Sequence, residues 1–192
     1  LNPTGGYLLK ATAEPSYDAL NSVPFFKARG DASAYLSFDE DGRFVAAGRV
    51  AYGTILGADL EDVPNDRRFY AGGGGSVRGY VYQSIGPYFP SFALPGTNPN
   101  FVDTPTGGLS LFEASLELRI GITETIQIVP FVDGGTVSDD LFPDFGEFKI
   151  GAGVGARYLT SFGPIRVDVG IPLDPGPRDG DFQIYAGIGQ SF

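Results

Sequence analysis

The feature of this sequence that most constrains its fold is a repeated alternation of polar and apolar residues. In the clearest segment, 112–120, every second residue is apolar and the residues between them are polar or charged. A period of two is typical of a β-strand whose two faces meet different surroundings. The segments 25–38, 165–171 and 182–189 repeat the pattern. We therefore predict an all-β chain of antiparallel strands, each with one apolar and one polar face.

Eight strands are expected from this pattern. They are placed near 5–14, 25–38, 43–56, 76–84 or a little later, 107–120, 124–136, 147–159 and 164–192. The last region has room for two strands. If the segment 76–84 is instead part of a loop, counting two strands in 164–192 again gives eight.

The expected connections alternate in length along the chain. The long or medium ones are 15–24, 57–106, 137–146 and 173–180, and the short ones between them are 39–42, 121–123 and 160–163. Long extracellular loops opposite tight periplasmic turns are typical of outer-membrane barrels, whereas a soluble sandwich has no reason to sort its loops by side. We predict an antiparallel transmembrane β-barrel with both termini on the short-turn side. An antiparallel sheet with one solvated face is the alternative.

Composition excludes several classes of function. The chain has no Cys, His, Met or Trp, which removes disulfides, thiolate chemistry and the commonest nitrogen ligand and general base. A net charge of −10 opposes binding to nucleic acid, whose phosphates need a basic surface. We expect no enzyme activity, no cofactor, no metal and no nucleic-acid partner. Since the chain begins at Leu1 without an apolar leader, we expect a mature product or a piece of a longer protein.

The most specific segment is Arg-Arg-Phe-Tyr-Ala-Gly-Gly-Gly-Gly-Ser-Val-Arg-Gly-Tyr at 67–80, followed by Gln83 and Gly86-Pro87. Its end, Val77-Arg78-Gly79-Tyr80, resembles the Val-Arg-Gly-Phe/Tyr hallmark of the sixth extracellular loop in the outer-membrane assembly family that includes BamA, TamA and the two-partner secretion transporters. Downstream, Phe131-Val132-Asp133-Gly134-Gly135 resembles the family's Phe-x-Asp-x-Gly strand motif, and 113–119 resembles its glutamate-bearing strand. The TamA branch is the most similar.

The resemblance implies that residues 1–192 are a single transmembrane region without a POTRA domain. This region corresponds to strands nine to sixteen of a sixteen-stranded barrel in the bacterial outer membrane. It also implies that the loop at about 57–106 folds back into the lumen, with Arg78 paired to Glu117 and Asp133.

If the loop lies in the lumen, as the resemblance implies, physical chemistry requires partners for Arg78. A guanidinium removed from bulk water is costly unless it is paired and hydrogen-bonded. Period two places both Glu117 and Asp133 on the polar, inward face of their strands. The planar fork of Arg can serve two carboxylates at once, which the point charge of Lys cannot do.

The C-terminus carries a second resemblance. Tyr185, Gly187 and Phe192 have the spacing of the β-signal by which barrel proteins are recognised during their own insertion. Gln190 departs from the hydrophobic or aromatic residue usual at its position. Phe192 is also compatible with a plain residue of the aromatic girdle.

The function that the resemblance implies is insertion of outer-membrane proteins, or translocation of autotransporters, through a lumen-anchored loop and a lateral strand seam. Its implied partners are outer-membrane lipids, client proteins and an inner-membrane-anchored partner of the parent protein. Two alternatives stay open at this point. One is a two-partner secretion transporter, and the other is a passive barrel whose polar lumen is lined by Arg29, Asp31, Glu113, Arg119, Arg157 and Arg166.

Overall fold

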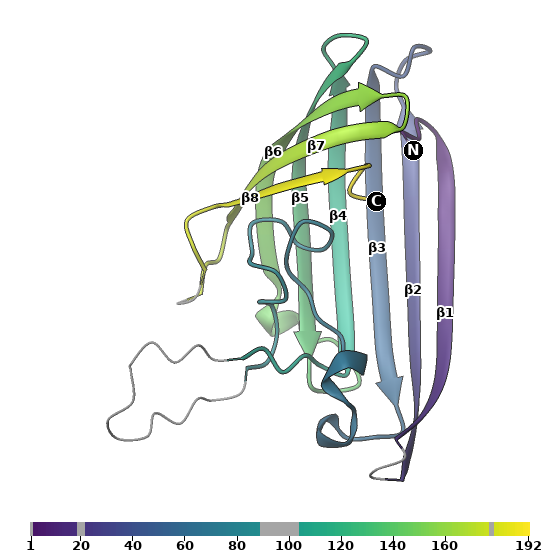
Figure 1. The fold of residues 1–192 in the computed structure, drawn as a ribbon, viewed down its shortest axis with the longest axis vertical. Coiled ribbons are helices and arrows are strands. Elements are labelled where there is room, and N and C mark those ends of the chain that lie inside the picture. The colour runs from purple at the N-terminus through teal and green to yellow at the C-terminus, as the bar shows by residue number, and fades with distance from the viewer. Residues whose placement is uncertain (1, 19–21, 89–103, 177–178) are drawn as a thin grey trace.

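The computed structural model describes residues 2–18, 22–88, 104–176 and 179–192. Eight antiparallel strands form one sheet in chain order (Figure 1). They are β1 (Gly6–Asp18), β2 (Val23–Ser37), β3 (Phe44–Leu56), β4 (Ser110–Gly121), β5 (Ile126–Ser138), β6 (Lys149–Thr160), β7 (Gly163–Pro172) and β8 (Gln183–Ile188). Since β1 and β8 do not pair within the described part of the chain, the sheet is an open half-barrel. The prediction of an all-β antiparallel fold is confirmed.

The expected strand near 76–84 is wrong. These residues lie in the connection between β3 and β4, residues 57–109, which we call the lumen loop. Its described parts hold only isolated bridges and two short 3₁₀ turns, η1 (Leu60–Asp62) and η2 (Asn65–Arg67). Positive φ at Gly79 (106°) and Gln83 (60°) turns the backbone away from extended geometry. Residues 89–103 lie outside the described residues.

The expected long connection at 15–24 is also wrong. β1 continues to Asp18 and β2 begins at Val23, while residues 19–21 lie outside the described part. The expected strand at 5–14 stops one residue before Pro15, but Pro15 lies in the ladder opposite Phe26, and the pairing continues to Asp18.

The remaining connections keep the expected alternation of lengths. The short turns 38–43 and 122–125 lie at the same end of the sheet as the N-terminus, and the longer connections 57–109 and 139–148 leave from the opposite end (Figure 1). The connection 139–148 contains a third 3₁₀ turn, η3 (Phe145–Glu147). None of the helical turns among the described residues is long and apolar enough to cross a membrane.

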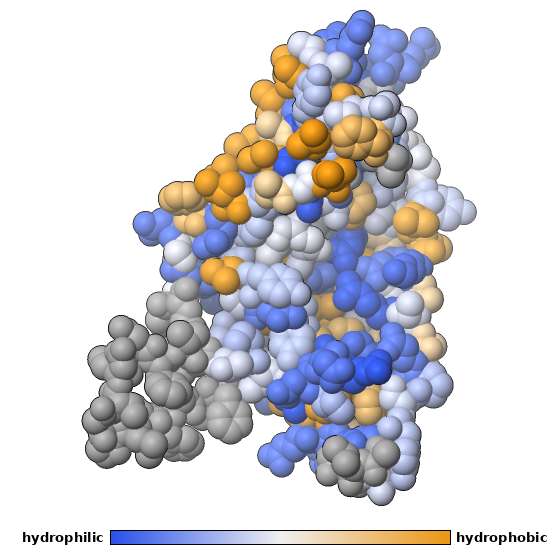
Figure 2. All heavy atoms as spheres, in the orientation of Figure 1, coloured by the Kyte–Doolittle hydropathy of each residue, from blue (hydrophilic) through white to orange (hydrophobic). Residues whose placement is uncertain are grey.

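The sheet has two chemically different faces, as the alternation predicts. On its convex face, the apolar residues are exposed, with Leu116 at 62% and Val132 at 48%. Figure 2 views the other side, where hydrophilic side chains cover much of the lower half and apolar ones gather over β6–β8 at the upper left. The buried charged residues of the strands, Glu113, Glu117, Arg119, Asp133, Arg157 and Asp168, lie on the face toward the lumen loop.

The lumen loop packs against the concave face through a hydrophobic cluster. The loop contributes Val63, Phe69, Ala71, Val77, Tyr80, Ile85 and Leu109. The sheet contributes Phe25, Ile55, Leu111 and Val137. Burial of these side chains supplies the main non-directional attraction between the loop and the sheet, at about 25 cal/mol per Å² of apolar surface. The polar contacts described below fix the position of the loop on that surface.

The exposed convex face predicts a specific sensitivity to charge. Leu116→Arg places a cation at the middle of β4 on the lipid side, and we expect it to lower the free energy of unfolding by about 2–4 kcal/mol. Leu141→Arg is the control, because Leu141 is similarly apolar and 41% exposed but lies in the connection after β5. Urea unfolding in lipid vesicles measures both. Equal losses in the two variants would contradict the assignment of the convex face to lipid.

Candidate functional site

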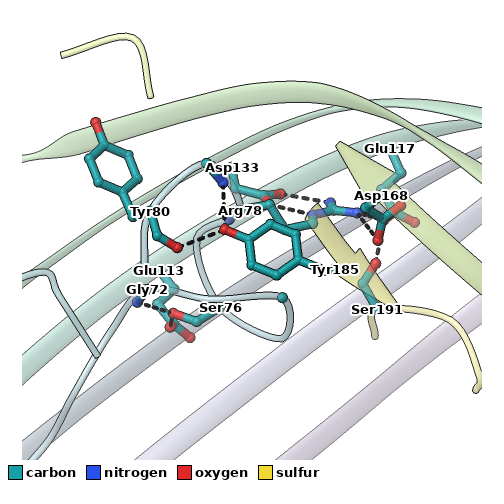
Figure 3. A network of polar contacts seen from close by, with 12 residues as sticks. Gly72, Ser76, Arg78, Tyr80, Glu113, Glu117, Asp133, Asp168, Tyr185 and Ser191 are labelled. Atoms are coloured by element: carbon teal, nitrogen blue, oxygen red, sulfur yellow. Dashed lines mark hydrogen bonds and ion pairs between the residues drawn. The ribbon is translucent and has the colours of Figure 1, made fainter. Parts of the chain in front are cut away.

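Arg78 lies at the centre of the contact between the lumen loop and the sheet, with 1% of its surface exposed (Figure 3). Its Nε and Nη2 donate to the two carboxylate oxygens of Asp133 at 2.6 and 2.9 Å. Its Nη1 donates to Glu117 Oε1 at 2.7 Å. The guanidinium carbon also lies 3.5 Å from the ring centroid of Phe131. The structure thus brings together four of the predicted site residues, Arg78, Glu117, Phe131 and Asp133.

The charge of Arg78 is secured by these partners. Burial alone lowers the pKa of a guanidinium, but the hydrogen bonds and charge of Asp133, with the charges of Glu117 and Asp168, outweigh burial and raise the pKa of Arg78 above its ordinary value. The main-chain N–H of Arg78 also donates to Asp133, at 3.1 Å. Arg78 is therefore a permanent cation held by both its side chain and its backbone.

A third carboxylate, Asp168 on β7, belongs to the same arrangement. Its Oδ2 lies 3.6 Å from Arg78 Nη1 and 3.5 Å from Arg166 Nη1, and its Oδ1 accepts a hydrogen bond from Arg157. Arg119 donates to Glu117 at 3.2 Å. We call this group the charge cluster, and its members are Arg78, Glu117, Arg119, Asp133, Arg157, Arg166 and Asp168.

The part of Asp168 in this cluster was not predicted from the sequence. Arg119, Arg157 and Arg166 were expected on the lumen side only as residues lining a water path. The available signal was the alternation of β7, in which Arg166 and Asp168 share the polar face. Within the described residues, Asp168 Oδ2 and Arg166 Nη1 make ion pairs but no hydrogen bond, so charge attraction alone holds that contact.

Glycines on β6 and β7 let the loop backbone lie directly on the wall. A Cβ at Gly151 would lie 1.9 Å from the carbonyl oxygen of Arg78, and one at Gly170 would lie 2.8 Å from the nitrogen of Gly79. Gly79 itself has φ +106°, a conformation that favours glycine. The predicted site residue Gly134 lies elsewhere: it makes room for the Phe148 ring, and its neighbour Gly135 faces Val77 of the loop.

Two tyrosine hydroxyls continue the contact beyond Arg78. The Tyr80 hydroxyl lies 3.1 Å from the carbonyl oxygen of Ile150 and 3.2 Å from that of Asp174, and burial raises its pKa, so it stays a neutral donor. The Tyr185 hydroxyl accepts from the N–H of Gly79 at 3.0 Å and donates to the carbonyl of Tyr80 at 2.6 Å (Figure 3). Tyr185 therefore links β8 to the loop.

A second polar anchor, absent from the sequence analysis, holds the start of the motif. The Ser76 hydroxyl donates to Glu113 on β4 and accepts from the N–H of Gly72 at 2.9 Å. Glu113 Oε2 also accepts from Arg49 at 3.1 Å and from Arg29 at 3.4 Å. Through this network, the loop is connected to β2 and β3 as well as to β4.

The C-terminal residues also lie on the concave side. The ring of Phe192 stacks on Tyr35 at a centroid distance of 6.4 Å, and the Ser191 hydroxyl donates to Glu117. A Cβ at Gly187 would lie 3.3 Å from Arg166 Nε. Whether Tyr185, Gly187 and Phe192 are read as an insertion signal stays a prediction.

The burial of Arg78 gives the first prediction for this site. Arg78→Ala leaves Asp133 and Glu117 without their main cation, and we expect the free energy of unfolding to fall by about 3–5 kcal/mol. Arg78→Lys should recover only part of it, because an ammonium cannot bond both carboxylates in the same plane. Arg67→Ala is the control, since Arg67 is half exposed and its ion pairs are 3.7 Å long. Full recovery of stability in Arg78→Lys would rule out the bidentate contact as the source of the stabilisation.

The close approach of the loop to β6 gives the second prediction. Gly151→Ala forces the Arg78 carbonyl away from the wall, and we expect a loss of about 1–3 kcal/mol with faster protease cleavage in the loop. Gly48→Ala is the matched control, because its Cβ would meet nothing closer than 3.8 Å. Limited proteolysis of both variants in vesicles measures the effect. Unchanged cleavage in the Gly151 variant would show that the loop does not depend on this contact.

Comparison with known proteins identifies the family. The Omp85 superfamily domain matches residues 1–192. Over 142 residues, the chain is 33% identical to the outer membrane protein assembly factor BamA of Nitratidesulfovibrio vulgaris, an alignment that covers 71% of this chain and 16% of that protein. The fold resembles the crystal structure of BamA from Haemophilus ducreyi lacking POTRA domains 1–3, with a TM-score of 0.75 and 22% identity over 95% of this chain and 38% of that one.

The chain therefore spans well under half the length of the BamA proteins that it matches. The family match extends over every strand and over the lumen loop with its charge cluster. These matches support the BamA/TamA-type family, while the TamA branch stays a prediction. The chain belongs to the Omp85 superfamily, and its sheet is wall of an integral outer-membrane β-barrel protein.

Proposed function

We propose that this chain is part of the barrel of a factor that assembles and inserts other outer-membrane proteins. The observation that carries the proposal is the lumen loop, fixed by the buried Arg78 against three strands and linked by Tyr185 to the edge strand β8. Both relatives that the chain matches are named BamA, and the one from Nitratidesulfovibrio vulgaris is named an outer membrane protein assembly factor.

The proposed mechanism uses β8 as the place where a client strand is added. β8 has six residues and is an edge of the sheet, so its outer N–H and C=O groups have no strand partner among the described residues. An edge of this kind is a template for pairing with an incoming strand. Gly187 within β8 weakens the strand further, which favours exchange of its partner.

The clients in this proposal are outer-membrane proteins or autotransporters, handled within the lipid of the outer membrane. An inner-membrane-anchored partner of the parent protein completes the proposal for autotransporter translocation. The concave face argues against a passive pore: Arg29, Arg49 and Glu113 are tied into an ion-pair network, and the lumen loop covers the centre of the sheet. A two-partner secretion transporter shares the anchored loop, so an experiment must separate the two.

Depletion of the parent protein separates these functions. An assembly factor predicts the loss of many outer-membrane proteins from the membrane proteome, whereas a dedicated transporter predicts the loss of one secreted client. A photo-reactive residue in place of Ala186, on β8, should cross-link to client strands, and the same residue in place of Val132, in the middle of the sheet, should not. An unchanged proteome would refute the proposed function.

A further inference from the structure

Tyr185 has a position that the proposed strand exchange does not explain. It lies on the concave face of β8, and its hydroxyl joins two consecutive groups of the lumen loop, the N–H of Gly79 and the carbonyl of Tyr80. Its ring packs on Gly74, where an added Cβ would meet ring and Cβ atoms at 3.0–3.1 Å. Tyr185 thus contacts the loop on both sides of Arg78.

β8 is held weakly by the sheet itself. It pairs with β7 over Ile165–Gly170 and has no second strand partner among the residues that the structure describes. The two hydrogen bonds of Tyr185 are therefore a sizeable addition to the bonds that hold β8 in place. Arg166 of β7 reinforces the contact by donating to the carbonyl of Gly74 at 3.0 Å.

The loop segment that Tyr185 contacts is itself fixed to other strands. Arg78 ties it to β4 and β5 through Glu117 and Asp133, and Ser76 ties it to Glu113. Since both anchors lie within a few residues of Gly79 and Tyr80, this segment cannot follow β8 if that strand moves. Movement of β8 away from the concave side must therefore break the Tyr185 contact.

We propose that Tyr185 is a positioning residue that holds β8 against the lumen loop, and that β8 accepts a client strand only after this contact is released. The inference rests on the proposed assembly function and adds a restraint that the edge strand alone does not have. The loop then controls the seam through β8, in addition to filling the concave side.

A conservative variant tests the hydroxyl contact directly. Tyr185→Phe keeps the ring against Gly74 and removes both hydrogen bonds, so we expect the Gly79 amide to exchange with deuterium about two- to tenfold faster. The control amide is that of Phe69, which donates to Gly108 at 2.9 Å within the same loop and should keep its rate. Unchanged exchange at Gly79 would overturn the assigned contact.

A reversible cross-link tests the consequence for assembly. The chain has no cysteine, and a Cβ at Gly74 would lie 3.1 Å from that of Tyr185, slightly short of the roughly 3.5–4.5 Å found in disulfides. The double variant Gly74→Cys/Tyr185→Cys should insert clients at least about tenfold more slowly when oxidised than when reduced, because the strand cannot leave the loop. The control Arg43→Cys/Gly121→Cys, with 3.7 Å between the two Cβ positions, joins the end of β4 to the turn between β2 and β3 and leaves β8 free.

The outcomes are distinguishable when the protein that carries residues 1–192 is assayed in lipid vesicles. If the oxidised Gly74/Tyr185 variant inserts clients as fast as its reduced form, the coupling is refuted and the assembly function stands. If the unaltered protein inserts no clients in the same vesicles, the proposed function itself fails. If the double variant does not fold, as judged by heat-modifiable gel mobility, deuterium exchange in Tyr185→Phe decides the question.

Discussion

The guanidinium of Arg78 determines how the rest of the concave side is built. A cation this deeply buried is tolerated only if carboxylates surround it and its donors are bonded, and those carboxylates come from β4, β5 and β7. Three strands must therefore be curved so that Glu117, Asp133 and Asp168 converge on one point. Residue 151 must be glycine for the same reason, because a side chain there would hold the Arg78 backbone away from β6.

The charge cluster determines where the lumen loop lies on the sheet more than it adds to the stability of the fold. Among its described members, four arginines face three carboxylates, and Asp168 Oδ2 has ion pairs without a hydrogen bond. A buried cluster of this kind is weak evidence for stability, since desolvation offsets much of the attraction. Its geometry nevertheless admits few alternatives, because shifting the loop would leave several charges unpaired at once. The apolar contacts of the lumen loop supply attraction, and the cluster supplies position.

Counting by two predicted which residues of each strand face inward, Glu117 and Asp133 among them. Their pairing with Arg78 was implied by the resemblance to the family and not by the alternation. Alternation places Asp168 and Tyr185 on the polar faces of their strands, but it does not show which groups of the lumen loop they reach, because that depends on how far the sheet curls. The first strand was expected to end at residue 14 and continues to Asp18, because Pro15 keeps its place in the ladder opposite Phe26, which alternation alone does not show. Tyr185 was singled out in the sequence only as part of the C-terminal β-signal. In the fold, it also holds β8 to the lumen loop.

The partners of the lumen loop also fix an order of events during folding. Arg78 precedes every residue that neutralises it: Glu117, Asp133 and Asp168 lie in strands that follow the loop in the chain. Contacts between residues this far apart in sequence carry a high entropic cost of loop closure and form slowly. The cation cannot meet all three carboxylates before β4, β5, β6 and β7 are paired in order. Capture of the loop is thus a late event in folding, one that completes only when the C-terminal strands are already registered against each other.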